Sequence, residues 1–313
     1  MGRLIVNADD FGLTAGVNRA IVELHQAGVL TSATLMARAA ATEEAIELAR
    51  ANPSLGVGCH VVLVDGEPVL SPRQDIPHLA DPVDGCFRPS LGGFLRELYR
   101  YWPLTTKMSR EIEAEAGAQI ALLKGRGLHI THIDTHKHTH MFPAVLRPVL
   151  RAAKAAGIRA VRNPFEPAWS LHATPGAPWI RLTEVRLLRW LEPAFRRIVA
   201  EEGFTTSNGA VGVLATGTLD AATVASLLTA LPEGTFELVS HPGYNDAALA
   251  HAHTRLLASR ETERNALQTL GQFPAVELIS FADLHSDAAH HPVTIPRRIF
   301  PAPQSVKENG KTK

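Results

Sequence analysis

The sequence predicts an α/β fold whose mainly parallel sheet closes into a TIM-like (β/α) barrel of seven or eight strands. Three observations predict this fold. Short runs rich in β-forming residues alternate with longer helical patterns, roughly seven or eight such units follow one another, and 313 residues suffice for one large α/β domain. An open doubly wound sheet is the competing architecture, although no GxGxxG motif follows the first apolar run to support a dinucleotide site.

Short apolar or β-branched runs are predicted as strands because each is bounded by turn-forming residues or by a helical pattern. They span residues 4–7, 33–36, 56–63, 129–134, 160–162, 211–214, 236–240 and 278–281. In parallel α/β architectures, ligands and catalytic groups gather at the carboxyl ends of the strands. The side chains that follow these runs are therefore the first candidates for a site.

Helices are predicted where apolar residues recur at helical spacing. They span residues 16–28, 42–51, 107–125, 144–156, 179–199, 219–230 and 254–271. In the first of them, Val17, Ile21 and Leu24 share one face, as expected of a helix that packs on a sheet.

Two Pro-rich segments interrupt this alternation. Residues 64–91 and 164–178 are expected to form long loops, which in compact domains are usually functional or disordered. We expect a single domain over residues 1–285. Residues 286–313 lose the periodicity, are rich in Pro and end in a Lys-rich run, so they are expected to form a disordered tail.

The bulk composition excludes several classes of protein. Lys plus Arg and Asp plus Glu both number 31, so no global charge recruits nucleic acid. Cys59 and Cys86 are the two cysteines, which excludes a disulfide framework and fits a reducing compartment. The amino-terminal apolar run is too short for a signal peptide, and no stretch of about 18 apolar residues predicts a spanning helix. We therefore expect a cytoplasmic protein.

A pair of carboxylates follows the first predicted strand. Asp9 and Asp10 come directly after it, and Gly12 then lets the chain turn away. Adjacent carboxylates repel each other unless their roles are separate, and a bound cation can take one and leave the other as a base. A turn followed by a helix cap is the simpler explanation, because Asp and Gly favour both. The histidines downstream favour the functional explanation.

The densest group of titratable residues lies between residues 131 and 143. Alternate positions of this segment carry His132, Asp134, His136, His138 and His140. On an extended strand these groups share one face, where they would be costly in a core without partners. A metal ion or a substrate is the natural partner. A surface His-rich loop with adventitious metal affinity is the alternative, which the apolar character of residues 128–133 disfavours.

Three further residues lie within or at the ends of predicted strands. His60 stands in an apolar run, where a lone His is more often a core residue than a ligand. His241 follows the run 236–240 and could protonate a leaving group or pack as a structural residue. Arg162 could orient a catalytic carboxylate, bind substrate or lie on the surface. An Asp-His-His set from different strands can converge at a barrel mouth, where a catalytic divalent ion keeps room for water.

Four motifs occur together in this chain. They are Asn7-Ala8-Asp9-Asp10-Phe11-Gly12, Gly58-Cys59-His60, Thr131-His132-Ile133-Asp134-Thr135-His136 and His241-Pro242-Gly243. In combination and in order, they resemble the YdjC/ChbG/HpnK family of carbohydrate deacetylases, and the resemblance covers residues 3 to about 285. Residues 60–70 look most like the hopanoid-biosynthesis-associated branch, HpnK.

The resemblance implies an irregular (β/α) barrel related to polysaccharide deacetylases, and a hydrolase that removes an acetyl group from an N-acetylated amino sugar. It implies one divalent metal ion, Mg²⁺ in this family, held by Asp10, His60 and His136. It also implies that Asp9 is the catalytic base. For the HpnK branch, the implied substrate is an acetylated amino sugar on a hopanoid. Ligand chemistry alone also suits Zn²⁺, Mn²⁺ or Co²⁺, so the identity of the metal stays open.

The expected mechanism uses these groups in sequence. The metal polarises the acetyl carbonyl and activates a water molecule, Asp9 accepts the proton, and His241 protonates the departing amine. The residues predicted to contact the substrate are Arg162, His132, Asp134 and His138.

Residues 165–199 combine tryptophans and arginines with an apolar helix face, a composition that suits a lipid–water interface. This predicts peripheral contact with the inner face of the membrane, which a glycolipid substrate would explain. An ordinary amphipathic helix that covers the barrel or forms a homodimer contact is the alternative.

Three other functions stay open at this point. The first is another metal-dependent hydrolase on a similar barrel, such as an amidohydrolase or a phosphoesterase, whose two-metal versions need additional ligands. The second is a metal-free glycosidase that uses Asp9 with another carboxylate. The third is a non-catalytic sugar- or glycolipid-binding protein, which the aligned His and Asp groups disfavour.

Overall fold

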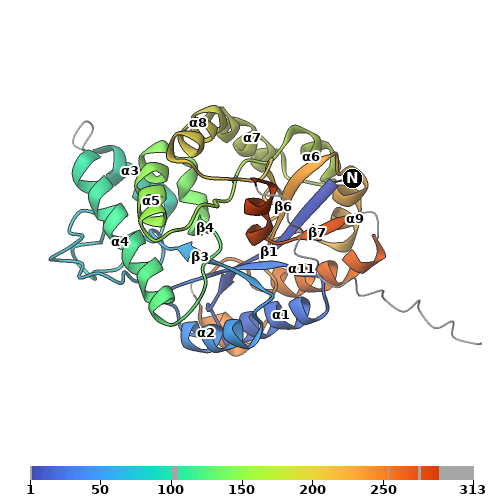
Figure 1. Cartoon of the computed structure of the whole chain (residues 1–313), viewed down its shortest axis with the longest axis horizontal. Helices are drawn as coiled ribbons and strands as arrows, with labels where there is room; N and C mark the ends of the chain where they lie inside the picture. The colour runs from blue at the N-terminus through green and yellow to red at the C-terminus, as the bar shows by residue number, and fades with distance from the viewer. Residues whose placement is uncertain (1, 101–104, 253, 274–275, 289–313) are drawn as a thin grey trace, which may run out of the picture.

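A computed structural model describes residues 2–100, 105–252, 254–273 and 276–288 of the chain. These residues form an α/β structure around a seven-stranded sheet in which every strand pair is parallel. The strand order is β4-β3-β2-β1-β6-β5, with β7 paired to β1. The helices surround this sheet, with α4 and α5 beside β3 and β4 and with α1 and α2 on another side (Figure 1).

The strands are β1 (Gly2–Phe11), β2 (Ser32–Leu35), β3 (Gly56–Val61), β4 (Ile133–Thr135), β5 (Ala210–Val211), β6 (Gly234–Ser240) and β7 (Glu277–Ile279). The α-helices are α1 (Ala15–Gln26), α2 (Thr42–Ala51), α3 (Leu91–Arg100), α4 (Thr105–Gly125), α5 (Pro143–Ala155), α6 (Ala168–Ala173), α7 (Trp179–Leu188), α8 (Glu192–Glu202), α9 (Ala221–Thr229), α10 (Ala247–His251) and α11 (Ser259–Leu267). The 3₁₀ segments are η1 (His136–Met141), η2 (Arg189–Leu191), η3 (Gln268–Gln272) and η4 (Phe281–Ala288).

Strand β1 is the centre of the sheet. One edge pairs with β6 from Gly2 to Ala8, while the other pairs with β7 near its start and with β2 near its end. Its register with β2 shifts between Ala8 and Phe11, and Asp10 within this interval has a φ of 64°. The carboxyl end of this central strand is therefore irregular, and it carries the two adjacent aspartates.

The parallel α/β sheet predicted from the sequence is confirmed, whereas the closed barrel stays a prediction. Residues 160–162, predicted as a strand, form only isolated bridges, from Val161 to Ile133 and from Ala160 to Thr205. These bridges are parallel and continue the hydrogen bonding beyond β4. Each bridge joins a single pair of residues, so residues 160–162 do not form a strand of a regular barrel.

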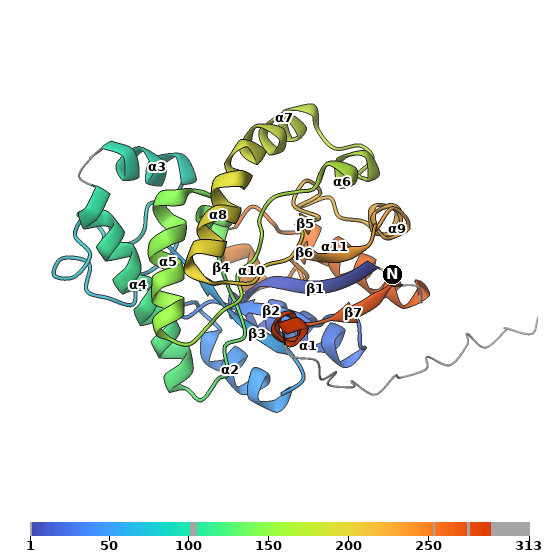
Figure 2. The same ribbon diagram turned by 45° about the horizontal axis from the view of Figure 1, so that its top comes forward.

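The helix predicted over residues 179–199 is interrupted. It divides into α7, the short η2 and α8, which together wrap one side of the molecule (Figure 2). Pro193 lies in the first turn of α8, where its ring clashes with the carbonyl four residues earlier and removes one helical hydrogen bond. A continuous helix through Arg189 is therefore disfavoured. Helices α3 and α6 lie in segments for which no helix was predicted.

The segment 64–91 is irregular, as predicted, but its backbone is tied to α4. Three polar side chains of α4 lie one turn apart on its inner face: Glu111, Glu115 and Gln119. They accept hydrogen bonds from the backbone N–H groups of Val62, Val69, Leu70, His78 and Leu79. A loop whose buried N–H groups are satisfied in this way needs no strand partner to keep its shape.

The predicted tail over residues 286–313 lies mostly outside the described residues, because the description ends at residue 288 within η4. Among the helices that are described, none combines the length and apolar character needed to cross a bilayer.

Gly58 in β3 is required by close packing against His132, the residue before β4. A Cβ atom at this position would lie 2.6 Å from the ring of His132, which itself stacks on Phe281 at 3.8 Å between ring centres. The His132 ring is fully buried between this position and Phe281. This explains why the motif before His60 carries a glycine.

Gly58→Ala should therefore lower the free energy of unfolding by about 1–3 kcal/mol through overpacking, measured by urea denaturation. Gly117→Ala in α4 is the matched control, because its added Cβ would lie 3.9 Å from Ala152 and should be neutral or mildly stabilising. Equal stabilities of the two variants would contradict the packing argument.

Candidate active site

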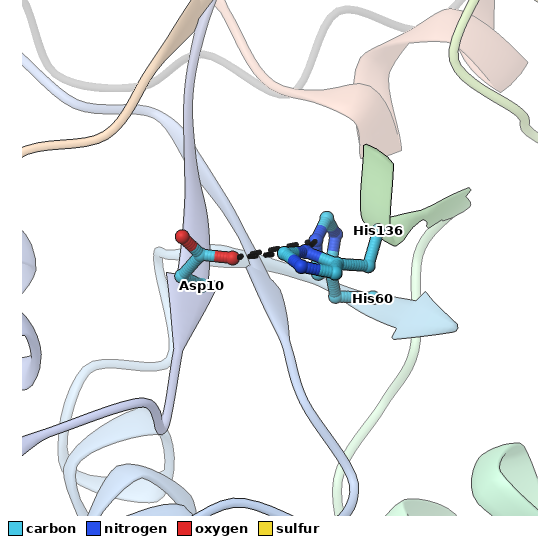
Figure 3. Close-up of side chains that lie close together, drawn as sticks. All are labelled: Asp10, His60 and His136. Carbon is cyan, nitrogen blue, oxygen red and sulfur yellow. Dashed lines mark hydrogen bonds and ion pairs between the residues drawn. The ribbon is translucent and has the colours of Figure 1, made fainter. Parts of the chain in front are cut away.

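Asp10 presents its carboxylate to two histidines from other elements. Its Oδ1 atom lies 3.5 Å from Nε2 of His60 in β3 and 3.4 Å from Nδ1 of His136 at the start of η1 (Figure 3). The other oxygen, Oδ2, accepts a hydrogen bond of 2.6 Å from Nη2 of Arg260. Burial would favour the neutral carboxyl, but Arg260 and the histidines hold the pKa of Asp10 well below its usual range.

Sheet register fixes the orientation of His60. His60 in β3 lies opposite Asp134 in β4, and its Nδ1 atom is 2.7 Å from Oδ1 of that aspartate. This carboxylate leaves Nε2 free to face Asp10 and His136, the last at 3.2 Å. Burial lowers the pKa of His60, but the charge of Asp134 more than reverses this and raises it to about 9. A carboxylate behind a histidine is the usual support for a metal-ligating imidazole.

These three side chains fit a divalent cation. One ligand atom from each of Asp10, His60 and His136 lies within 4.8 Å of the others. The Oδ1 atom of Asp10 is buried and has no hydrogen-bond donor among the described residues, which is costly for a carboxylate oxygen. A cation between the three groups would satisfy this oxygen. Two imidazoles and one carboxylate suit Zn²⁺, Mn²⁺ or Co²⁺ as well as Mg²⁺.

Asp9 forms an ion pair with Arg162, and its carboxylate also lies within 4.8 Å of a ring nitrogen of His60. Its two oxygens accept hydrogen bonds of 2.6 and 2.8 Å from the guanidinium, and Oδ1 also accepts one from Asn7 and one from Thr34. Burial acts against ionisation, but the charge and hydrogen bonds of Arg162 outweigh it and hold the pKa of Asp9 well below its usual range. Asp9 is therefore a carboxylate at any physiological pH.

Arg162 binds three carboxylates at once. Besides Asp9, its guanidinium forms ion pairs with Asp134 and, at 2.6 Å, with Glu237 of β6. All of these side chains are fully enclosed or nearly so. Burial would lower the pKa of Arg162, yet the carboxylates raise it well above its usual value. Burial raises the pKa of Glu237 to about 7 despite the arginine.

The four residues predicted to contact substrate fall into two groups. Arg162, His132 and Asp134 have no exposed surface, so their burial is at odds with direct substrate contact and favours a positioning role. Burial lowers the pKa of His132 to about 3, which keeps its stacked ring neutral. His138 is half-buried in η1 with a φ of 51°, and burial together with Arg162 lowers its pKa to about 3. Of the four, His138 keeps access to solvent.

His241 directly follows β6 and lies beside Asp9. Its Nε2 atom is 3.8 Å from Oδ2 of Asp9, and its Nδ1 atom is 3.6 Å from Oε2 of Glu263. Burial lowers the pKa of His241, but Glu263 and the two aspartates raise it above its ordinary value. The imidazole is thus held between two carboxylates and favours its protonated form.

Three residues of this arrangement were not predicted from the sequence. Glu237 is an acidic residue inside the apolar run of β6, and that contrast is a usable signal. Arg260 and Glu263 lie in α11 among other charged residues, where the sequence gives no indication which of them face the site.

The family described as YdjC-like protein matches residues 3–270. The chain belongs to this family. The match covers all of the candidate site, from Asp9 to Glu263, so the YdjC-like assignment and the geometry concern the same residues.

Several relatives of this YdjC-like chain are named carbohydrate deacetylase. The protein of Brevibacillus brevis is 45% identical over 163 residues, which is 52% of this chain and 60% of that protein. The human protein is 33% identical over 254 residues, covering 77% of this chain and 75% of its own length. The aligned part thus spans about 60% of the first of these relatives.

One solved structure has a similar fold. It is a protein of Enterococcus faecalis V583 that carries the name of a candidate cellobiose-phosphate cleavage protein. It superposes with a TM-score of 0.71 at 25% identity, covering 90% of this chain and 98% of that one.

Arg162→Met leaves the buried carboxylates without their counter-charge, so we expect the free energy of unfolding at pH 7 to fall by about 3–5 kcal/mol. In the wild type, folding lowers the pKa values of Asp9 and Asp134 below their ordinary value of 3.8. The stabilisation that results is present above pH 3.8, and it is lost as the pH falls through the lowered pKa values of the folded state. The variant lacks this contribution, and protonation relieves its unpaired carboxylates. The deficit should therefore shrink as the pH falls from 7 toward 4.

Urea unfolding at several pH values measures this deficit. Arg147→Met is the control, because Arg147 pairs with Glu201 and Glu202 at the surface and should contribute at most about 1 kcal/mol. A deficit for Arg162→Met that is small, or the same at all pH values, would refute the role of Arg162 as the counter-charge.

Proposed function

We propose that this YdjC-like protein is a metal-dependent carbohydrate deacetylase that removes an acetyl group from an N-acetylated amino sugar. The observation that carries the proposal is the convergence of Asp10, His60 and His136 beside a separate carboxylate and a separate imidazole. The names of the relatives support the reaction class. A one-metal amide hydrolase needs these parts: a cation site, a base and an acid.

Asp10, His60 and His136 would hold the ion. A divalent cation supplies Lewis-acid chemistry for an amide carbonyl and for a water molecule. The protein's own contribution is orientation: Asp134 fixes the ring of His60, and Arg260 fixes the carboxylate of Asp10. These two contacts leave Nε2 of His60 and Oδ1 of Asp10 directed at the proposed position of the ion.

Asp9 is proposed as the group that accepts the proton of the attacking water. Arg162 keeps it ionised and fixes both of its oxygens. The same contact makes it a weak base, because the guanidinium lowers its pKa. A fixed weak base is useful only when the proton donor is itself acidified, which a divalent cation would provide.

His241 is proposed as the acid that protonates the leaving amine. An amine is expelled poorly as an anion, so a proton must reach the nitrogen as the C–N bond breaks. Although burial acts in the opposite direction, Glu263 and the two aspartates raise the pKa of His241, which favours the protonated ring that an acid needs. His138, half-buried near Arg162, is the residue we propose for contact with the sugar.

The substrate is proposed to be lipid-linked, and a hopanoid carrier would agree with the resemblance of residues 60–70 to the HpnK branch. Support comes from the surface of α7 and η2. Helix α7 has no buried residue, and Trp179 and Trp190 are 75% and 84% exposed. Ile180 and Leu187 of α7 are also exposed. Residues 179–197 carry five arginines and two glutamates, which favours an anionic membrane surface.

Purified protein with measured metal content should release acetate from at least one member of a panel of N-acetylated sugars and glycolipids. Asp9→Asn should lower kcat by about 10²-fold or more, while bound metal stays near one ion per chain because the proposed ligands are untouched. Asp220→Asn is the control, since it changes an aspartate that caps α9 to a residue that also caps helices.

Full activity of Asp9→Asn would remove Asp9 from the role of base. Acetate release that survives removal of the metal by a chelator would count against metal dependence. Two ions per chain would favour the amidohydrolase or phosphoesterase class.

The double variant Trp179→Ala/Trp190→Ala should reduce cosedimentation with vesicles that contain anionic lipid by roughly tenfold or more, because it removes both exposed indole rings from the proposed contact face. Tyr99→Ala is the control, because it removes an exposed aromatic residue from α3. Failure of the wild-type protein to bind such vesicles would contradict the membrane contact. Elution of the wild type as a dimer that the double variant disrupts would show instead that this surface contacts a second copy of the protein.

A further inference from the structure

Helix α11 brings two fully buried charged side chains to the candidate site. Arg260 and Glu263 are three residues apart and therefore lie on the same face of the helix. Arg260 holds Oδ2 of Asp10, and Glu263 lies beside His241. One helix near the carboxyl-terminal end thus contacts both a proposed metal ligand and the proposed acid.

Glu263 contacts His241 at two points. Its Oε2 atom accepts the backbone N–H of His241 at 2.6 Å and lies 3.6 Å from Nδ1 of the same residue. Its Oε1 atom accepts the backbone N–H of Gly217 at 3.0 Å. The carboxylate therefore cannot turn away from the imidazole without losing two backbone hydrogen bonds.

We propose that Glu263 is a positioning residue for His241, which holds a proton on Nδ1 and directs Nε2 at the reaction centre. The inference rests on the proposed deacetylase function for its catalytic consequence. A carboxylate facing Nδ1 selects the tautomer and orientation of an imidazole. The Nε2 atom then faces Oδ2 of Asp9, on the side where the amide would react.

The proton transfer that this orientation serves can be written in full. The electron pair of the breaking C–N bond stays on nitrogen, and the Nε2 proton of His241 forms the new N–H bond. The acyl group leaves as acetic acid, which carries the oxygen and one proton of the water, while Asp9 holds the other proton. Glu263 keeps its own charge throughout, and the ring is left neutral with its proton on Nδ1. Loss of the Asp9 proton to solvent and uptake of one proton by Nε2 of His241 then restore both groups.

The competing explanation is that Glu263 only satisfies backbone N–H groups. The chain offers a matched case in Glu166. That carboxylate is also buried and accepts the backbone N–H groups of Gly212 and Leu214, but its side-chain partner is Ser170, not a histidine. Glu166→Gln therefore measures the cost of disturbing a buried backbone-capping carboxylate, without any effect through His241.

The first test is an NMR titration of the metal-loaded protein labelled with ¹⁵N-histidine, with the His241 signals assigned from His241→Asn. The groups that face this ring are Glu263 from α11 and Asp9 and Asp10 from β1. Glu263→Gln removes one of these charges and should lower the titration midpoint of His241 by about one pH unit. Glu166→Gln should leave it unchanged. An unshifted midpoint in Glu263→Gln would overturn the proposal, whether or not a substrate has been found.

The second test is a double-mutant cycle on acetate release. Glu263→Gln should lower kcat about 10- to 100-fold with KM and metal content nearly unchanged, yet add less than about twofold in a His241→Ala background. A purely structural role predicts that the two losses multiply, and that Glu166→Gln causes a similar loss. If Glu263→Gln does not fold, Glu263→Asp applies the same cycle with the charge retained. Absence of acetate release from the wild type would instead contradict the proposed function alone.

Discussion

The ion cluster around Arg162 is the interaction on which the rest of the site depends. One guanidinium, with no access to solvent, holds Asp9, Asp134 and Glu237 in place. Two of these carboxylates also contact a histidine, because Asp134 orients His60 and Asp9 faces His241. Without the arginine, the carboxylates would repel one another in a medium of low dielectric and would take up protons instead. The positions of both histidines therefore follow from a charge that touches neither of them directly.

One oxygen of Asp10 lacks a hydrogen-bond partner at this centre, within the part of the chain that the structure describes. Four buried acidic side chains, from Asp9, Asp10, Asp134 and Glu237, meet the two guanidinium groups of Arg162 and Arg260 there. The arginines neutralise Asp9, Asp134 and one oxygen of Asp10, but the other oxygen of Asp10 has no donor among the described residues. Asp9, His60 and Asp134 form a second group with the spacing of metal ligands, but Arg162 already pairs with both of its carboxylates. The Asp10 oxygen without a donor thus lies where the two imidazole nitrogens converge.

The sequence predicted the groups at strand ends better than the groups that support them. Asp10 and His136 could be singled out because polar residues directly after apolar runs are conspicuous, and parallel strands bring their carboxyl ends together. His60 stands inside an apolar run and joined them as a predicted ligand only through the resemblance of the four motifs. Arg260 and Glu263 could not be singled out, because α11 also carries Glu261 and Arg264, and the helical pattern alone does not say which face meets the sheet. The polar face of α4 could not be predicted either, since Glu111 and Glu115 look like solvent-facing residues until the loop that they bind is known. The prediction of one long helix over residues 179–199 was wrong because the proline near the start of α8 interrupts the hydrogen bonding that the apolar pattern alone would continue.

The two adjacent aspartates show how one irregular residue separates two chemical roles. In a regular strand, consecutive side chains point to opposite faces, so Asp9 and Asp10 could not both reach the same imidazole from a flat β1. The left-handed φ of 64° at Asp10, together with the shifted register, turns the second carboxylate toward Nε2 of His60. Asp9 remains on the side of Nδ1, linked to that atom through the hydroxyl of Thr34. A non-glycine residue in this conformation costs about 1–2 kcal/mol, which the short ion pair with Arg260 helps to offset. The strain is therefore located at the one residue whose carboxylate leaves the strand's alternation to face His60 and His136.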